Sequence, residues 1–191
     1  MKRALARGVD RVESEIDMTT AHTTPHARNV VALAEDEGES IWFLDTLVTT
    51  KLRAQDGGDY GLIEYSMPQG GSTPFHRHHC EDESLYVLEG ELRVVLEDRV
   101  LHATRGSYVH LPRGRAHGLI AVSAARVLVL SRPDGFVEFM RELGTPAPVR
   151  ELPPPSAASP ELSRVLEVAA RYQIEILGPT PTGAADSRPA Q

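Results

Sequence analysis

The stretch FHRHHCEDESLYVLEG, residues 75–90, places three histidines and four carboxylates within sixteen positions. Two interpretations compete: a solvated polar turn, or a group of side chains that bind one metal ion. In a strand, side chains two residues apart point to the same side. His76 and His78 can therefore reach one point while His79 points away. Glu83 opens the next apolar segment and could reach the same point after a tight turn.

A fourth candidate ligand lies much further along the chain. Six of the eight histidines fall between His76 and His117. His117 follows the segment GSYVHLPRGRAHG, which a β-barrel can bring alongside the first cluster. Three imidazoles and one carboxylate suit the borderline first-row ions Fe, Mn, Co, Ni, Cu or Zn. Four protein ligands in a six-coordinate shell leave two positions open, as a catalytic site requires. We therefore expect one divalent transition-metal ion of open identity.

The segments on either side indicate many short strands. The sequences IWFLDTLVTTKL (41–52) and YGLIEYSMP (60–68) are rich in β-branched and aromatic residues, and each is predicted to be a strand. The QDGGD segment between them has turn chemistry. From residue 84 to 133, short apolar segments alternate with turn signals, and ELRVVLE alternates with period two. This pattern predicts an all-β sandwich or barrel.

Two helices are predicted after the barrel. Asp134 is the expected cap of GFVEFMRELG, and Gly144 is expected to end that helix. Ser159 is the expected cap of the second helix, with Pro160 at its first position. The apolar stripes comprise Phe136, Phe139, Met140 and Leu143 in the first helix, and Leu162, Val165, Leu166 and Ala169 in the second. The Pro-rich segment between the helices is expected to be extended.

The chain divides into four parts on this interpretation. Residues 1–28 lack apolar periodicity and are predicted to form a flexible N-terminal arm, followed by the barrel over 29–133. Residues 134–178 are assigned to a helical cap, and 179–191 to a disordered tail. Met18 is an alternative to Met1 as the start of translation.

Composition excludes several classes of protein. The net charge of −7 argues against nucleic acid as the main partner. No apolar run reaches the length of a membrane span, and no apolar segment follows the basic start as in a secretory signal. Cys80 is the single cysteine, so no internal disulfide can form. A soluble, cytoplasmic protein is expected.

Two segments resemble the two motifs of the cupin superfamily. The fixed positions of the first motif are matched by Gly70, His76, His78, Glu83 and Gly90. Those of the second are matched by Gly106, Pro112, Gly114 and His117. The usual terminal Asn of the second motif is Ala121 here. That Asn is not a ligand in the family pattern, so the departure bears on local hydrogen bonding.

The resemblance implies a double-stranded β-helix, or jelly roll, with the metal inside the barrel and His76, His78, Glu83 and His117 as ligands. Glu81 is the alternative carboxylate, but Glu83 aligns with the family's strand start and leaves Glu81 in the turn. The resemblance extends over roughly 40–133. The segment DGFVEFMRELGTPA is also similar to the C-terminal part of single-domain cupins (monocupins) of the quercetin-2,3-dioxygenase-like kind.

The function implied by this resemblance is that of a metal-dependent dioxygenase acting on an aromatic or enol-bearing small molecule with O2. Glu83 would then be the catalytic base as well as a ligand. The alternatives are a redox-neutral isomerase, cyclase or lyase, and a non-enzymatic cupin that binds small molecules. A homodimer is also expected, because cupin relatives commonly pair and the strands at 29–52 supply edges that an isolated barrel would leave unpaired.

Other residues have simpler interpretations. His79 is expected to face solvent or a neighbouring chain, and His102 to be an exposed hairpin residue. His110 could face the barrel or its outside, and stays a candidate for contact with a metal ligand. Cys80 is assigned to the turn. The residues interpreted as core are Tyr65, Met67, Leu85, Val87 and Leu119, some of which must also line the pocket if the barrel holds an internal site. Those interpreted as a cap on the barrel are Phe136, Phe139 and Met140.

Overall fold

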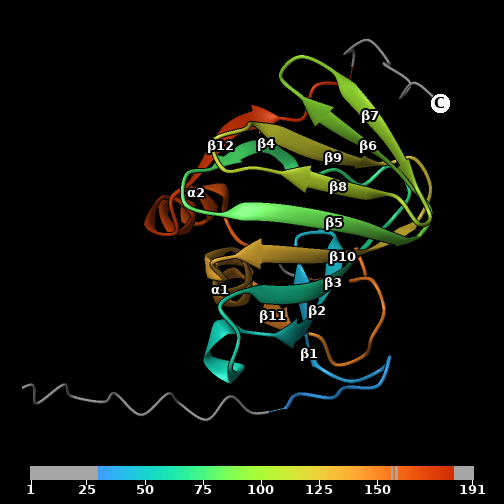
Figure 1. Ribbon diagram of the computed structural model, residues 1–191, viewed down its shortest axis with the longest axis vertical. Coiled ribbons are helices and arrows are strands. Elements are labelled where there is room, and N and C mark those ends of the chain that lie inside the picture. The colour runs from blue at the N-terminus through green and yellow to red at the C-terminus, as the bar shows by residue number, and fades with distance from the viewer. Residues whose placement is uncertain (1–29, 156, 158, 183–191) are drawn as a thin grey trace, which may run out of the picture.

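Two facing sheets form the body of the protein (Figure 1). The computed structural model describes residues 30–155, 157 and 159–182. The first sheet has the order β11-β1-β2-β3-β10-β5-β8 and the second the order β12-β4-β9-β6-β7. The predicted all-β jelly roll with C-terminal helices is confirmed.

The strands of the first sheet are β1 (Glu39–Phe43), β2 (Thr46–Leu52), β3 (Gly61–Met67), β5 (Asp82–Glu89), β8 (Tyr108–Leu111), β10 (Ala125–Arg132) and β11 (Thr145–Pro146). Those of the second are β4 (Pro74–His78), β6 (Glu91–Leu96), β7 (Val100–Thr104), β9 (His117–Ala121) and β12 (Ile174–Pro179). A short 3-10 helix, η1 (Ala54–Asp56), connects β2 to β3. The two α-helices are α1 (Gly135–Leu143) and α2 (Leu162–Arg171).

Alternate positions of the strands fill the space between the sheets. In β3, Ile63, Tyr65 and Met67 are buried, and the residues between them are only partly covered. Leu85 and Val87 of β5 follow the same alternation and are buried too. Because side chains of a strand alternate between its faces, the apolar face of each of these strands points toward the interior of the barrel. The interpretation of Met67, Leu85 and Val87 as core is confirmed.

The prediction of one strand over 41–52 is wrong, because β1 and β2 form a hairpin. Phe43 pairs with Thr46, so Leu44 and Asp45 are its two-residue turn. Leu44 has a φ of 55°. Such turns usually contain glycine or asparagine. Here the apolar run WFL continues into the turn, so the sequence gives no turn signal.

The C-terminal part contains the predicted helices, with corrected ends. Helix α1 begins at Gly135 with Asp134 at the N-cap position, as predicted, but the Asp134 side chain makes no capping hydrogen bond, since it accepts the backbone N–H of Ala54 at 2.8 Å. Helix α2 begins at Leu162 with Glu161 as the residue before it, and not at Ser159 and Pro160.

The apolar faces of the helices also differ from the prediction. In α1 the buried residues are Val137, Phe139, Met140 and Leu143, whereas Phe136 is only partly buried. In α2 they are Val165, Val168 and Ala169. Leu162 and Leu166 are exposed. Both helices lie on the same side of the barrel, at the left of Figure 1.

A further strand replaces part of the expected helical cap. Residues 174–178 were assigned to that cap and residue 179 to the disordered tail, but 174–179 form β12, which pairs with β4. In the Pro-rich linker, β11 pairs with β1. The arm predicted over 1–28 lies outside the described residues, as does the tail from 183 onward. Among the described residues, no helix combines the length and the apolar character needed to cross a membrane.

Candidate metal centre

Three strands carry the four predicted ligands into the barrel. His76 and His78 are two residues apart in β4, Glu83 lies near the start of β5, and His117 is the first residue of β9. His76 pairs directly with His117 across the two strands. All four side chains are buried, at 6% exposure or less. His76 and His78 therefore point to the same side of β4, and the barrel brings His117 beside them, as the sequence predicted.

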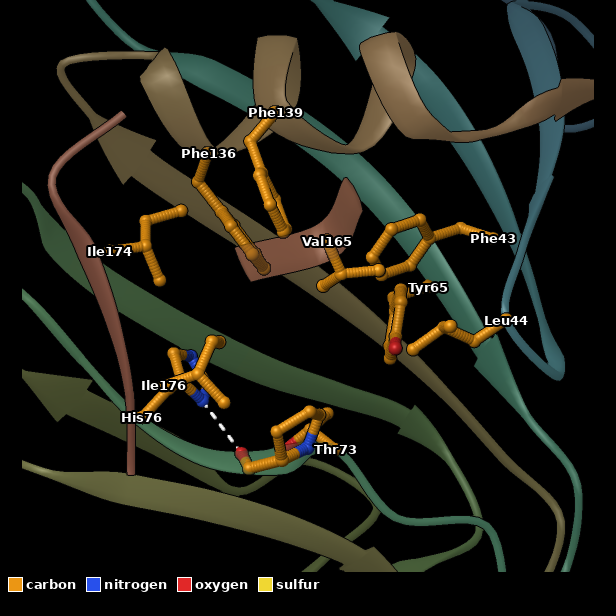
Figure 2. A pocket seen from close by; sticks show the side chains of 11 residues that line it. Phe43, Leu44, Tyr65, Thr73, His76, Phe136, Phe139, Val165, Ile174 and Ile176 are labelled. Atoms are coloured by element: carbon orange, nitrogen blue, oxygen red, sulfur yellow. Dashed lines mark hydrogen bonds between the residues drawn. The ribbon is translucent and has the colours of Figure 1, made fainter. Parts of the chain in front are cut away.

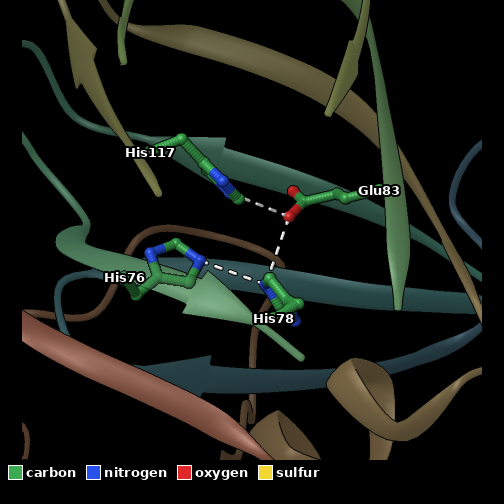
Figure 3. A group of neighbouring side chains, drawn as sticks. All are labelled: His76, His78, Glu83 and His117. Atoms are coloured by element: carbon green, nitrogen blue, oxygen red, sulfur yellow. Dashed lines mark hydrogen bonds and ion pairs between the residues drawn. The ribbon is translucent and has the colours of Figure 1, made fainter. Parts of the chain in front are cut away.

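The ligand atoms of these residues converge (Figure 3). One atom from each of His76, His78, Glu83 and His117 lies within 4.8 Å of the other three. Nε2 of His76 is 3.1 Å from Nε2 of His78. Oε2 of Glu83 is 3.3 Å from Nε2 of His78 and 3.2 Å from Nε2 of His117. This cluster is compatible with one metal ion.

The opposite nitrogen of each imidazole has its own hydrogen-bond acceptor. Nδ1 of His76 donates to the carbonyl of Pro74 at 2.8 Å, and Nδ1 of His117 donates to the carbonyl of Arg115 at 3.1 Å. Nδ1 of His78 donates to Oε2 of Glu81 at 2.8 Å. A carbonyl oxygen only accepts, so Nδ1 carries the proton in His76 and His117. Such outer acceptors orient metal-binding imidazoles.

This arrangement leaves lone pairs that need a cation. With the proton on Nδ1, the Nε2 atom of a neutral His117 faces the ionised Glu83 with a lone pair. A proton on Nε2 of His78 can be shared in hydrogen bonds to Nε2 of His76 and Oε2 of Glu83. No proton then lies between Nε2 of His117 and Oε2 of Glu83. Because a buried polar group without a partner is costly, a metal ion that accepts all the lone pairs resolves the conflict. The donor set therefore fits the metal expected from the sequence.

In the metal-free cluster the pKa values of the two histidines of β4 are shifted in opposite directions. Burial and the neighbouring His117 and His78 lower the pKa of His76 to about 3. Burial also opposes a charge on His78, but hydrogen bonds to Glu81 and Glu83 outweigh it and raise the pKa of His78 to about 9. Burial alone would raise the pKa of Glu83, yet the adjacent imidazoles of His117 and His78 hold it well below the usual range. Glu83 is thus ionised, and His78 is the positively charged histidine, with a proton on both ring nitrogens.

Glu81 lies behind the ligands and not among them. It is 2% exposed, and its two oxygens have different partners. Oε2 accepts the hydrogen bond from His78, and Oε1 accepts the backbone N–H of Phe136 at 2.6 Å. A Cβ atom on Gly135 would lie 2.7 Å from Oε1, so glycine there leaves room for this contact. Sequence reasoning left Glu81 in the turn and missed this role, since acidic turn residues are common.

The remaining polar candidates lie away from the cluster. His79 is about half exposed and pairs with Glu175 at 3.0 Å. His110 is exposed on β8, where Ser84 is its partner at 3.2 Å, so it does not contact a candidate ligand. His102 pairs with Glu91 at 3.4 Å in β7 and is only partly exposed. The thiol of Cys80 donates to Gln173 at 3.0 Å.

Two adjoining cavities lead away from the candidate ligands. A small one touches Glu83, His117 and His76. A second is lined almost entirely by apolar side chains. We call the second one the inner cavity (Figure 2). Both are lined by Tyr65, Thr73, His76 and Phe136, so they meet at these residues.

The inner cavity includes residues that sequence reasoning placed elsewhere. Phe136 and Phe139 were interpreted as a cap and also line this cavity, and Tyr65 belongs to the core as interpreted while lining it too. Ile174 and Ile176 of β12 also line it, as does Leu44 of the hairpin turn. No local signal marked the last three, because their position depends on pairing of distant strands. Leu119, also interpreted as core, lines the smaller cavity.

Residues 63–131 match the family model described as Cupin domain. This part of the chain has a cupin fold. The match contains all four candidate ligands and ends just before helix α1. Finer placement as quercetin-2,3-dioxygenase-like does not follow from it. No curated protein matches the sequence.

Solved structures similar to the cupin barrel include KdgF from Halomonas sp., at 18% identity and a TM-score of 0.49, covering 55% of this chain and 94% of that one. The polyketide cyclase RemF from Streptomyces resistomycificus is 29% identical, with a TM-score of 0.43, over 52% of this chain and 70% of that one. A sugar phosphate isomerase from Silicibacter pomeroyi is 20% identical, with a TM-score of 0.43, over 46% and 59%. A cupin fold hosts many activities, so the reaction has to be inferred from the site.

Proposed function

We propose that the protein is a metal-dependent dioxygenase of the quercetin-2,3-dioxygenase-like kind, acting on an aromatic or enol-bearing small molecule. The supporting observation is the continuity between the four candidate ligands and the apolar inner cavity. His76 lines both cavities, so a molecule held in the inner cavity can present a polar atom to the cluster. An apolar pocket with a few convergent polar groups is typical of small-molecule sites.

The shape of the inner cavity favours a flat, largely apolar ligand. The rings of Phe136 and Phe139 are stacked with centroids 6.3 Å apart, and the rings of Phe136 and His78 are nearly perpendicular with centroids 4.9 Å apart. Phe43, Val165 and Ile174 complete the apolar wall. Aromatic side chains of this kind bind planar ligands by stacking and by edge contacts.

Two polar groups would fix the ligand's orientation. His76 stands at the junction of the two cavities, and the Tyr65 hydroxyl is the second polar group. Burial raises the pKa of Tyr65, and the nearby Asp45 and Glu83 carboxylates raise it further, against the hydrogen bond with Thr46. Its phenol therefore stays neutral and can donate a hydrogen bond to a ligand oxygen.

The proposed reaction begins with loss of a proton from the substrate hydroxyl. Glu83 is the candidate acceptor, because it is ionised, buried and part of the cluster. A bound metal ion would supply the positive charge that stabilises the deprotonated substrate oxygen. O2 is the oxidant; both of its atoms enter the product as a carbon–carbon bond breaks. The apolar wall keeps water away from the reacting carbon atoms.

The test is oxygen uptake by protein loaded separately with each candidate metal and offered flavonols, β-diketones and catechols. Glu83→Gln should retain part of the metal, since three histidines remain, and should lose on the order of a hundred- to ten-thousand-fold in per-metal rate. Glu175→Gln, at an exposed carboxylate paired with a histidine, is the matched control and should keep the full rate.

The outcomes separate the competing functions. Equal per-metal rates in Glu83→Gln and the wild type would reject Glu83 as the base. Turnover that continues unchanged under nitrogen would replace the oxygenase with a redox-neutral isomerase, cyclase or lyase. Binding of these compounds without any turnover would indicate a non-enzymatic cupin.

A further inference from the structure

The tip of the β1–β2 hairpin lies between the inner cavity and a surface groove. Leu44 lines the inner cavity and also lines this groove. Figure 2 shows His76 and Leu44 at opposite ends of the view of the inner cavity. We call the second space the outer groove; its other lining residues are Asp45, Pro68, Leu152, Pro153, Pro154, Pro155, Ala157 and Ser159.

The chain holds both walls of the outer groove in place. Indole Nε1 of Trp42, in β1, donates to the carbonyl of Glu151 at 2.8 Å, which fixes the proline segment beside the hairpin. The backbone N–H of Ala147 donates to Ser40 at 3.0 Å. Proline restricts its own φ angle, so Pro153, Pro154 and Pro155 form a stiff wall. The outer groove is thus a built feature of the fold.

Leu44 occupies a backbone conformation that leucine rarely adopts. Its φ of 55° lies in the left-handed region, where glycine is preferred. The strands on both sides impose this conformation, since Phe43 pairs with Thr46 and the Thr46 hydroxyl donates to the Phe43 carbonyl at 2.5 Å. Strained residues of this kind gather at ligand sites. Position 44 therefore carries a leucine side chain although glycine would fit this backbone conformation better.

We propose that Leu44 is a gate between the inner cavity and the outer groove, and that the ligand extends past it from one into the other. The proposal rests on the proposed function in one respect, namely that a ligand occupies the inner cavity beside the metal site. It adds the ligand's overall form: an apolar ring near His76 and an extension that leaves along the proline wall. Leu44 then determines which extensions are accepted.

The charge of the outer groove restricts the chemistry of that extension. Asp45 is the one charged residue among its described lining residues, and no lysine or arginine joins it. A carboxylate or phosphate at the end of the extension would face Asp45 without a counter-charge. The extension is therefore neutral or positively charged.

The experiment uses the full-length protein loaded with one equivalent of Zn²⁺, so that binding is measured without O2 chemistry. The probes are 4-alkylcatechols with side chains from methyl to octyl, and octyl analogues ending in an ammonium or a carboxylate. The variants are Leu44→Gly and Asp45→Asn. Gln173→Gly is the matched control, because Gln173 has a φ of 56° and lines neither space.

The expected results separate a gate from a structural role. Leu44→Gly should strengthen binding of the octyl probe about fivefold relative to the methyl probe, because passage no longer displaces a partly buried side chain. Gln173→Gly should leave that ratio unchanged, although both variants remove a left-handed non-glycine residue. The ammonium probe should bind about fivefold better than the carboxylate probe, and Asp45→Asn should remove most of that difference.

Three results would overturn the proposal. The first is an unchanged octyl-to-methyl ratio in Leu44→Gly, and the second is a preference for the carboxylate probe in the wild type. The third is failure of every catechol to bind Zn²⁺-loaded protein, which would remove the ligand from the inner cavity altogether. Absence of oxygen uptake would reject only the dioxygenase, since none of these measurements requires turnover.

Discussion

The carboxylate of Glu81 accepts a hydrogen bond from Nδ1 of His78 at 2.8 Å, and both side chains are 2% exposed. The same carboxylate accepts the backbone N–H of Phe136, the second residue of α1. One buried acid therefore orients a candidate ligand and holds the helix that covers the inner cavity. Loss of either hydrogen bond should affect both features.

Glu81→Ala is expected to weaken metal affinity about ten- to a hundred-fold, because the tautomer and orientation of His78 lose their support. Metal titration monitored by calorimetry measures this. Glu175→Ala, which removes the corresponding partner of the exposed His79, should leave the affinity unchanged. An unaltered dissociation constant in Glu81→Ala would show that His78 needs no such partner.

Removal of a single candidate ligand should lower metal content, while loss of a nearby exposed histidine should not. We expect His76→Ala and His117→Ala to bind well under one equivalent of metal, and His79→Ala to bind one equivalent. Elemental analysis of the purified proteins is the measurement. A full equivalent in His76→Ala or His117→Ala would contradict the four-ligand site.

Metal affinity should increase with pH. The pKa of His78 is raised to about 9, so below that pH a metal ion must displace one proton from it. The apparent dissociation constant should therefore fall about tenfold for each unit of pH between 6 and 8. Competition with a chelator of known affinity at several pH values tests this. A flat profile would mean that His78 is not the protonated residue of the metal-free cluster.

Tyr65→Phe should preserve metal content and weaken the binding of oxygen-bearing ligands. The change removes one hydroxyl at the junction of the two cavities, and a lost hydrogen bond of this kind corresponds to about a three- to tenfold weaker affinity. Binding of 4-methylcatechol to the Zn²⁺-loaded variant measures the effect. An affinity equal to that of the wild type would remove Tyr65 from the ligand site.

A homodimer stays a prediction, although β11 covers part of the β1 edge that suggested it. One chain has a mass of 20.9 kDa, and light scattering at micromolar concentration should give twice that mass. A mass equal to one chain would exclude the dimer under those conditions.

The barrel and its ligands were predictable because both depend on short, regular spacings. Period-two alternation identified the strands, and His76 and His78 share a face for the same reason. His117 needed the family motif, since its contact with His76 joins strands far apart in sequence.

The missed features depend on tertiary contacts. The turn at Leu44 contains no glycine or asparagine, so its local sequence continues the apolar run. Residues 174–179 are too few to show a clear period, and pairing with β4 decides their conformation. The role of Glu81 depends on α1 lying against the turn that contains it, which no local pattern reports.

The pairing of β12 with β4 has a consequence for how the protein matures. Ile176 lies opposite His76, although the two are synthesised far apart in time. While the chain emerges from the ribosome, the strand with the first two histidines has only β9 as a neighbour, and its other edge is open. We therefore expect a ribosome-bound chain stalled before residue 174 to bind a metal ion more weakly than a chain that contains β12.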